Sequence, residues 1–198
     1  GHGQPESGTN IGPAQVSERV LREAFFPPFK RIIEETGVGA IMPSYNEIDG
    51  QPSHASVWLL RDILRKEWGY QGLTVSDYFG NRELITRHRL AADNREAAIR
   101  ALLAGVDVET PDPETYKELP ALVREGKVPE ALIDEAVRRV LSFKFEAGLF
   151  ENPYVDEAAA EALTATPASI ALARRAATRS AVLLKNDGVL PLEAKKIK

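Results

Sequence analysis

A carboxylate at the end of a predicted strand is the side chain in this sequence best placed for chemistry. Asp77 follows residues 73–75, an apolar and β-branched run bounded by glycine that predicts a buried strand, and Tyr78 comes directly after it. The C-terminal ends of strands are where α/β proteins place their reacting groups. An aspartate here is also typical of a helix cap or a turn, so this stretch alone leaves both roles open.

A tyrosine follows the preceding predicted strand in the same way. Residues 38–42 form an apolar run bounded by turn signals, and Tyr45 lies between this run and the turn signal Asp49-Gly50. Tyr45 would therefore stand in the mouth of whatever site the strand ends define. The alternative is a partly buried ring with a hydrogen-bonded hydroxyl.

The elements that must position these residues alternate along the chain. Apolar stripes predict helices over residues 18–36 (kinked or restarted at Pro27-Pro28), 56–68, 94–104, 116–125, 129–147 and 169–180. Strands are expected at residues 38–42, 73–75 and 106–109, and a strand or extended run at 181–185. A solvated face or loop is expected at 81–90, and a linker or outer loop at 151–167.

Strands that alternate with amphipathic helices predict parallel β/α units, and hence an α/β fold. Three such strands before the linker are too few for a closed (β/α)8 barrel, which needs about 250 residues. We therefore expect a partial (β/α)8 TIM-like barrel that comprises the last β/α units and is truncated at both ends. The absence of an initiating Met before Gly1 supports that expectation.

The composition limits the classes of partner that the chain can bind. Hydrophobic residues make up 43% and charged residues 27%, which is ordinary for a globular protein, and the net charge of −4 argues against nucleic acid or an anionic membrane as partner. The chain has no cysteine and no apolar run near the roughly 18 residues of a membrane span. We predict no metal and no cofactor. The compartment stays open, with a periplasmic or secreted protein preferred to a cytoplasmic one.

Several motifs resemble one family. Residues 40–53 (Ala-Ile-Met-Pro-Ser-Tyr-Asn-Glu-Ile-Asp-Gly-Gln-Pro-Ser) resemble the Met-x-Ser-Tyr-Asn…Asn/Asp-Gly-x-Pro motif of glycoside hydrolase family three, and residues 58–78 resemble its nucleophile segment. Residues 104–107, 148–154 and 181–192 also match, in the family's order. Any one match is weak, but together they are highly specific.

The resemblance implies a β-glucosidase-like or β-xylosidase-like enzyme whose active site lies between a (β/α)8-like barrel and an α/β sandwich domain. Residues 1–150 would be the C-terminal part of the catalytic barrel. Residues 151–198 would be the linker, a helix and the first strand that lead to the missing sandwich domain. Gly1-His2-Gly3 looks like the residues just after the family's Lys-His substrate-binding pair, which this chain lacks.

The same resemblance implies roles for three residues. Asp77 would be the nucleophile, Tyr45 a neighbour of the nucleophile and the substrate, and Tyr78 the aromatic that flanks the sugar. The general acid/base would be a Glu of the missing domain, so the fragment would be inactive alone. Thr9 and Asn10 stand where many family glucosidases have an arginine, which leaves the glycone open between glucose and xylose.

The implied reaction is exo-acting, retaining hydrolysis of an oligosaccharide or of an aryl or alkyl β-glycoside by double displacement. It needs two carboxyls about 5–5.5 Å apart, one of them ionised. Asp77 suits the ionised role, and Tyr45 would stabilise the anion if it donates a hydrogen bond to it. The N-acetylglucosaminidase branch is set aside, because residues 4–10 lack its Asp-Ser-x-His pattern.

Two functions from other classes were weighed against this one. The first is a metal-assisted barrel enzyme with Asp77, Asp107 and Glu109 around a divalent cation. We expect instead that Asp107 and Glu109 make structural hydrogen bonds at the barrel mouth. The second is a non-catalytic carbohydrate-binding remnant, in which replacing Asp77 changes only the affinity for sugar.

Overall fold

The structure is a computed structural model that describes residues 4–193. The chain forms two compact units, unit 1 (Gly1–Glu151) and unit 2 (Asn152–Lys198). The segment Gly1-His2-Gly3, which carries part of the family resemblance, lies outside the described residues.

Three extended segments lie parallel at the centre of unit 1. β1 (Ala40–Ile41) pairs with β4 (Leu73–Thr74), and Val75 forms a parallel bridge with Val108. The sheet thus has the order 40–41, 73–75, 108, with β4 in the middle. This parallel arrangement confirms the predicted α/β class with strands that alternate with helices.

A two-stranded hairpin follows β1. β2 (Glu47–Ile48) and β3 (Gln51–Pro52) pair antiparallel around Asp49 and Gly50, whose φ angles are +50° and +78°. Positive φ at both central residues is the type I′ geometry that favours Asp-Gly, so the predicted turn is confirmed. The hairpin leads the chain back across the end of β1 toward the next helix.

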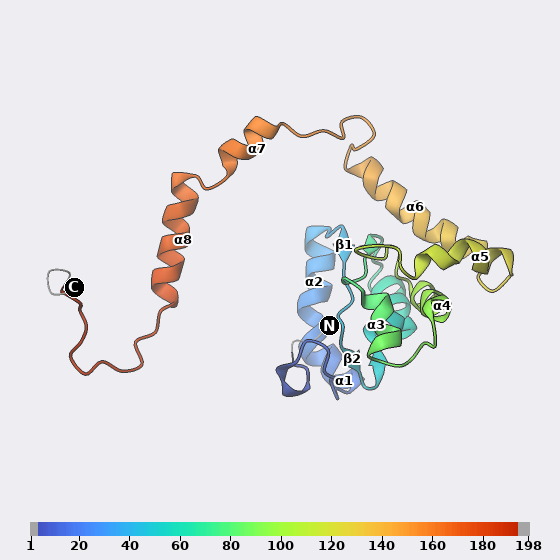
Figure 1. The fold of residues 1–198 in the computed structure, drawn as a ribbon, viewed down its shortest axis with the longest axis horizontal. Coiled ribbons are helices and arrows are strands. Elements are labelled where there is room, and N and C mark those ends of the chain that lie inside the picture. The colour runs from blue at the N-terminus through green and yellow to red at the C-terminus, as the bar shows by residue number, and fades with distance from the viewer. Residues whose placement is uncertain (1–3, 194–198) are drawn as a thin grey trace. The chain divides into compact units, whose positions relative to one another are not determined.

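Helices surround these strands in unit 1 (Figure 1). Several are short 3-10 or π-helical segments that continue into a neighbouring α-helix. In chain order they are η1 (Glu6–Gly8), α1 (Glu18–Val20), η2 (Leu21–Phe25), α2 (Phe26–Thr36), η3 (Ser53–Ala55), η4 (Trp58–Glu67), α3 (Gly80–Thr86), α4 (Asn94–Ala104), η5 (Tyr116–Glu118), α5 (Leu119–Arg124) and α6 (Glu130–Glu146).

The helix boundaries follow from capping residues and proline positions. The helical residues run without a break from Glu18 through η2 to Thr36, so the helix does not restart at Pro27-Pro28. The two prolines stand in the first turn of α2, directly after the π-helical segment η2. It ends at Gly37, whose φ of +63° is the left-handed C-terminal geometry that glycine allows. Asp93 caps α4 by accepting a hydrogen bond from the Glu96 amide, as the capping-box spacing predicts.

The core of unit 1 lies between the strands and these helices. α3 packs on α4, and α4 packs on η3 and α5 (Figure 1). Small residues on α4 permit this close approach. The main buried cluster consists of Leu60, Leu64, Tyr70, Leu84, Ala91, Ala97, Ala101, Ala104 and Val106.

Two predicted segments differ in the structure. Residues 80–86 form α3 rather than a solvated loop, because Leu84, which is fully buried, anchors the helix among charged neighbours. The predicted strand at 106–109 is reduced to the single bridge at Val108. Residues 181–185, expected as a strand or an extended run, are an extended run, because no described segment pairs with them.

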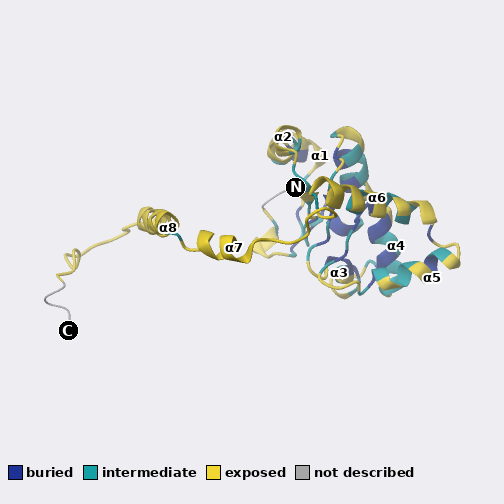
Figure 2. Ribbon diagram, turned by 90° about the horizontal axis from the view of Figure 1, so that it is seen from above, coloured by how far each residue is buried: buried dark blue, intermediate teal, exposed yellow. Residues whose placement is uncertain are grey.

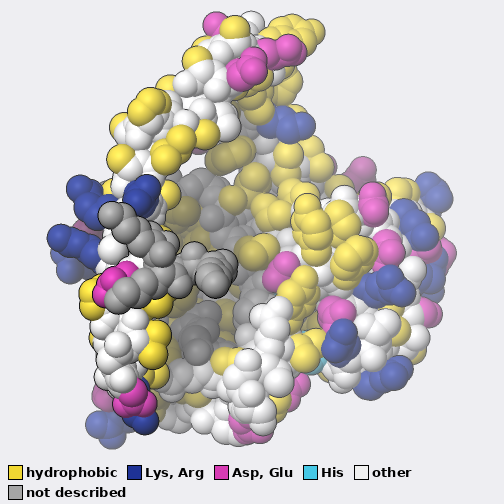
Figure 3. Space-filling view, turned by 60° about the vertical axis from the view of Figure 1, so that its left-hand side comes forward, with side chains coloured by type: hydrophobic (Ala, Val, Ile, Leu, Met, Phe, Trp, Pro, Cys, Tyr) yellow, Lys and Arg dark blue, Asp and Glu magenta, His cyan; other side chains and the backbone are white. Residues whose placement is uncertain are grey.

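Unit 2 consists of two capped helices and an extended end. α7 (Glu157–Leu163) replaces part of the expected linker, since its alanine-rich sequence favours a helix that Asp156 caps. α8 (Pro167–Ser180) is capped by Thr166. The residues of both helices are exposed (Figure 2). Many hydrophobic side chains of the chain are exposed at its surface (Figure 3).

Within residues 4–193, every helix is too short or too polar to traverse a lipid bilayer.

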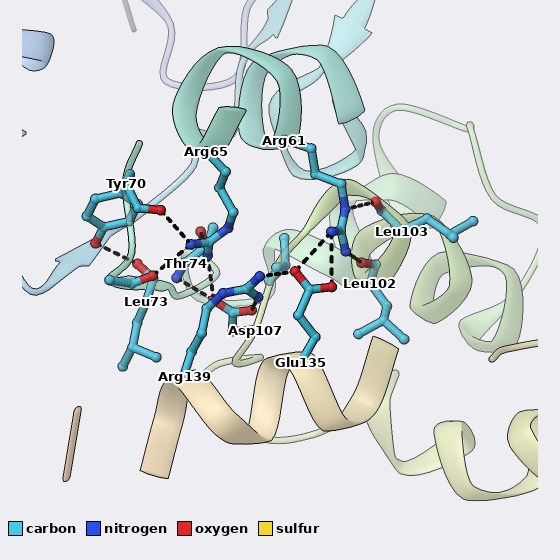
Figure 4. A network of polar contacts seen from close by, with 12 residues as sticks. Arg61, Arg65, Tyr70, Leu73, Thr74, Leu102, Leu103, Asp107, Glu135 and Arg139 are labelled. Atoms are coloured by element: carbon cyan, nitrogen blue, oxygen red, sulfur yellow. Dashed lines mark hydrogen bonds and ion pairs between the residues drawn. The ribbon is translucent and has the colours of Figure 1, made fainter. Parts of the chain in front are cut away.

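A buried ionic network joins the strands to two helices. The Asp107 side chain is 1% exposed and pairs with Arg65 of η4 at 2.8 Å and with Arg139 of α6 at 2.7 Å. It also accepts the Thr74 amide of β4 at 2.9 Å. Glu135 of α6 pairs with Arg139 and with Arg61, so the network bridges both helices (Figure 4).

We predict that Asp107→Asn lowers the free energy of unfolding by about 3–5 kcal/mol, because it leaves two largely buried arginines without their carboxylate. Glu23→Gln is the matched control, since it makes the same change in the exposed Arg19–Glu23 pair and should cost less than about 1 kcal/mol. Urea denaturation of the 198-residue chain, followed by tryptophan fluorescence, measures both. An equal loss of unfolding free energy in the two variants would contradict a stabilising role for the buried Asp107 network.

Candidate active site

Asp77 lies directly beyond the C-terminal end of β4. The strand end is tied to the neighbouring segment through Ser76, whose amide donates to the Val108 carbonyl at 2.8 Å. The Ser76 hydroxyl accepts the Thr110 amide, and the Thr110 hydroxyl donates to the Ser76 carbonyl at 2.7 Å. These bonds fix the backbone immediately before Asp77.

The backbone of Asp77 itself is held on both sides. Its amide donates to Nε2 of His54 at 3.1 Å, and its carbonyl accepts the Gly80 amide at 2.9 Å. Its carboxylate Oδ1 accepts the Tyr78 amide at 2.7 Å. The carboxylate is half-buried, so it is both oriented and open to a ligand.

The turn after Asp77 is strained. Phe79 has a φ of +63°, which is uncommon for a bulky residue, and it precedes the first residue of α3. The Phe79 amide donates to the Thr110 carbonyl at 2.9 Å, which holds this conformation. Strain of this kind costs about 1–3 kcal/mol and is concentrated at functional sites.

The structure brings Tyr45 and Tyr78 to Asp77. The Tyr45 hydroxyl donates to the Tyr78 carbonyl at 2.6 Å, and it also lies close enough to the Asp77 carboxylate to interact with it. Burial, with a further contribution from the nearby Asp77 carboxylate, raises the pKa of Tyr45 to about 12. Its phenol therefore stays protonated at neutral pH. The Tyr78 side chain is 60% exposed, so its ring is accessible from solvent.

His54 is a site residue that the sequence analysis did not single out. It is 2% exposed, and its ring stacks on Tyr45 with centroids 6.3 Å apart. Burial lowers the pKa of His54 to about 4, so the ring is neutral and Nε2 accepts the Asp77 amide. The signal for this role is weak, because the two residues lie 23 positions apart and His54 is a lone histidine between small residues.

A hollow of about 760 Å³ lies next to the turn that follows Asp77, and its lining includes Phe79 and His88 but none of Asp77, Tyr45, Tyr78 and His54. Nε2 of His88 lies 2.8 Å from the Tyr45 carbonyl oxygen. Carboxylates line it as well, but Glu83 is paired with Arg87, and Glu47 lies 3.5 Å from Nδ1 of His88. The hollow is polar and open enough for a ligand with many hydroxyls.

Asp107 and Glu109 are engaged by protein donors. Asp107 accepts bonds from Thr74 and its two arginines, as described above. Glu109 accepts bonds from both amides and the hydroxyl of the Thr115-Tyr116 stretch at 2.7–3.1 Å, and burial raises its pKa. The predicted structural hydrogen bonds of both carboxylates are thus confirmed. Across residues 4–193 no three side chains of His, Cys, Asp or Glu form a group that fits a metal ion.

Comparisons with known proteins identify relatives over nearly the whole chain. The family model described as the glycosyl hydrolase family 3 N-terminal domain matches residues 1–143. The periplasmic β-glucosidase of Salmonella typhimurium is 40% identical over 97% of this chain and 26% of its own length. A putative β-xylosidase of Formosa agariphila is 36% identical over 99% of this chain and 26% of its own length.

A solved structure agrees with these relatives. The β-glucosidase of Listeria innocua in complex with glucose superposes with a TM-score of 0.83 and 37% identity, over 95% of this chain and 26% of that chain. The chain therefore spans about a quarter of the length of the relatives it matches.

We predict that His54 makes the chain less stable in acid. Its pKa is about 4 when folded and 6.5 when unfolded, so the unfolded state binds more protons between these values. Stability is therefore complete above pH 6.5 and falls by about 3 kcal/mol as the pH drops to 4. Urea denaturation at pH 7 and pH 4.5 should show a smaller loss for His54→Gln. Identical losses in the variant and the wild type would show that His54 is not a buried neutral ring.

Proposed function

The chain belongs to glycosyl hydrolase family 3, and from this premise we propose that it supplies the nucleophile side of a retaining β-glycosidase active site. Asp77 is the nucleophile. Its fixed backbone at the end of β4 is the observation that carries the proposal, since the amide, the carbonyl and Oδ1 are each hydrogen-bonded. A carboxylate held in this way is preorganised for in-line attack.

The reaction follows double displacement. The Asp77 carboxylate attacks the anomeric carbon while the glycosidic oxygen departs with a proton from a general acid, which leaves a glycosyl ester on Asp77. Water, deprotonated by the same acid/base group, then attacks the anomeric carbon and frees the Asp77 carboxylate. Two inversions restore the β configuration. The attacking group of the first step is the ionised carboxylate of Asp77, and the hydrogen bond from the Tyr78 amide to Oδ1 orients it.

Tyr45 and Tyr78 have complementary roles in this proposal. Tyr45 is a protonated phenol that fixes the Tyr78 carbonyl and packs against His54. The exposed ring of Tyr78 offers an apolar face to the C–H groups of the sugar. Both therefore contact or position the substrate without taking part in bond cleavage.

We place the proton donor outside residues 1–198. Retention needs a second carboxyl about 5–5.5 Å from the nucleophile. The carboxylates that line the neighbouring hollow, Glu47 and Glu83, already face His88 and Arg87. The chain also spans only 26% of the Salmonella relative. Residues 1–150 would then be the last part of a (β/α)8-like barrel, and residues 151–198 would lead to an α/β sandwich domain that carries the acid.

A β-glucosidase is the first choice of glycone, and a β-xylosidase is the second. The Salmonella and Listeria relatives are named as β-glucosidases, and the Formosa relative as a putative β-xylosidase. The ratio of kcat/KM for aryl β-glucoside and aryl β-xyloside, measured on the full-length protein, decides between them. The Salmonella protein is named as periplasmic, which supports our preference for a periplasmic or secreted protein.

We predict that the 198-residue chain alone hydrolyses aryl β-glycosides at less than a tenth of the rate of the full-length protein, because it lacks the group that protonates the leaving oxygen. Side-by-side assays with a nitrophenyl glycoside measure the two rates. Activity of the 198-residue chain within tenfold of the full-length protein would mean that the proton donor lies within residues 1–198.

In the full-length protein, Asp77→Ala should lower kcat on the order of a thousandfold or more, since no covalent intermediate can form. Azide should restore turnover by attacking the anomeric carbon from the vacated face, which yields the α-glycosyl azide. Asp62→Ala removes an exposed carboxylate paired with Lys66 and is the control, expected to be unaffected. Wild-type turnover by Asp77→Ala would refute Asp77 as the nucleophile. Absence of turnover by the wild-type full-length protein, with Asp77→Ala altering only the affinity for sugar, would favour the carbohydrate-binding remnant.

A further inference from the structure

We propose that His54 is a positioning residue that holds the Asp77 peptide, and with it the carboxylate, in the direction needed for attack. The proposal rests on the role of Asp77 as nucleophile given above. His54 lies on η3, just after the β2–β3 hairpin, and it reaches the end of β4 from a separate part of the chain. It touches the nucleophile backbone rather than the reacting atoms, so its effect is exerted through Asp77.

The hydrogen-bond pattern of the central strand shows what His54 replaces. Along β4 and its extension, amides alternate between the two neighbouring segments. Those of Leu73 and Val75 donate to the carbonyls of Gly39 and Ile41 on the β1 side, at 2.9 Å each. Those of Thr74 and Ser76 donate toward the segment that contains Asp107 and Val108.

By this alternation the Asp77 amide points to the β1 side. β1 has already ended at Ile41, and the chain there turns away toward the hairpin. Nε2 of His54 occupies the acceptor position instead, 3.1 Å from the Asp77 nitrogen. The His54 side chain therefore accepts the last hydrogen bond on this side of the strand, at the residue whose carboxylate must be fixed.

The His54 ring is confined by Gly80 and Tyr45. A Cβ atom on Gly80 would lie only 2.1 Å from Nε2 of His54, so the ring rests directly on the Gly80 backbone. The Tyr45 ring stacks on the ring of His54 at an interplanar angle of 26°. The Gly80 amide also donates to the Asp77 carbonyl, which closes a short loop of contacts through His54, Asp77 and Gly80.

Only a neutral ring can play this part, because a protonated histidine has no lone pair to accept the amide. The ring also hydrogen-bonds to the Ser44 backbone, which occupies its other polar contact. The charged groups that act on the ring are the Asp77 carboxylate, which favours protonation, and His88, which opposes it. Burial outweighs both effects and keeps the His54 ring neutral at neutral pH.

Loss of this acceptor should impair catalysis more than binding. Without it, the peptide before Tyr78 can rotate, and small displacements of a reacting group cost on the order of 100-fold in rate. Substrate affinity depends on other contacts and should change little. The test compares His54→Leu, which keeps bulk without an acceptor, with His54→Gln, whose amide oxygen can accept the Asp77 N–H.

In the full-length protein, we expect His54→Leu to lower kcat for an aryl β-glucoside by about 10- to 100-fold, with KM changed by less than about threefold. His54→Gln should recover most of the rate. Gly80→Ala is the second variant, because its new methyl group pushes His54 away from Asp77, and it should reproduce the loss. Leu122→Ala is the control for destabilisation alone, since Leu122 is fully buried in a different cluster.

The control should lower the melting temperature and leave kcat per folded molecule unchanged. Equal rates for His54→Leu and His54→Gln, or a loss that follows the melting temperature as in Leu122→Ala, would overturn the positioning role. If His54→Leu does not fold, Gly80→Ala with wild-type kcat overturns it equally. Azide rescue of Asp77→Ala distinguishes the role of His54 from the role of Asp77. If azide restores turnover and His54→Leu keeps wild-type kcat, only the positioning role of His54 is refuted. If azide does not restore turnover, the assignment of Asp77 as the nucleophile is refuted.

Discussion

The Asp107 carboxylate, buried between two arginines, fixes the central strand on which the site is built. It binds the Thr74 amide of β4 directly and joins that strand to η4 through Arg65 and to α6 through Arg139. Burying a carboxylate costs several kcal/mol unless charged and hydrogen-bonding partners compensate for it. Here both oxygens have such partners, so strand and helices are held in one arrangement.

Side chains fix the C-terminal end of the same strand at two points. The ladder itself is short, since β1 and β4 contain two residues each and Val108 adds a single bridge. Asp107 accepts the amide of Thr74, the last residue of β4, and His54 accepts the amide of Asp77, just beyond that strand. The backbone between them therefore has little freedom, and the direction of the Asp77 carboxylate is set by the fold rather than by the substrate.

The sequence predicted most of the elements because their signals are local. The Asp49-Gly50 turn, the end of α2 at Gly37 and the parallel order of the strands each follow from residues close in the chain. α3 was missed because its one fully buried apolar residue, Leu84, stands among charged side chains. The extended run at 181–185 has strand composition, but a strand exists only when another segment pairs with it.

The site was predictable in part for a related reason. Asp77 and Tyr45 stand at strand ends, which the periodicity identifies, and the structure brings both together with Tyr78. His54 was not predictable, since its function depends on a contact with Asp77 across 23 positions and on the absence of a side chain at Gly80. A lone histidine between small residues carries no periodic signal of such a contact.

The most direct measurement is covalent labelling of the full-length protein with a 2-deoxy-2-fluoro glycoside that carries a good leaving group. The fluorine slows hydrolysis of the glycosyl ester, so the intermediate accumulates and the labelled peptide can be sequenced by mass spectrometry. The account predicts a single label on Asp77. A label on Glu47, Glu83 or any other carboxylate, with Asp77 unmodified, would contradict it.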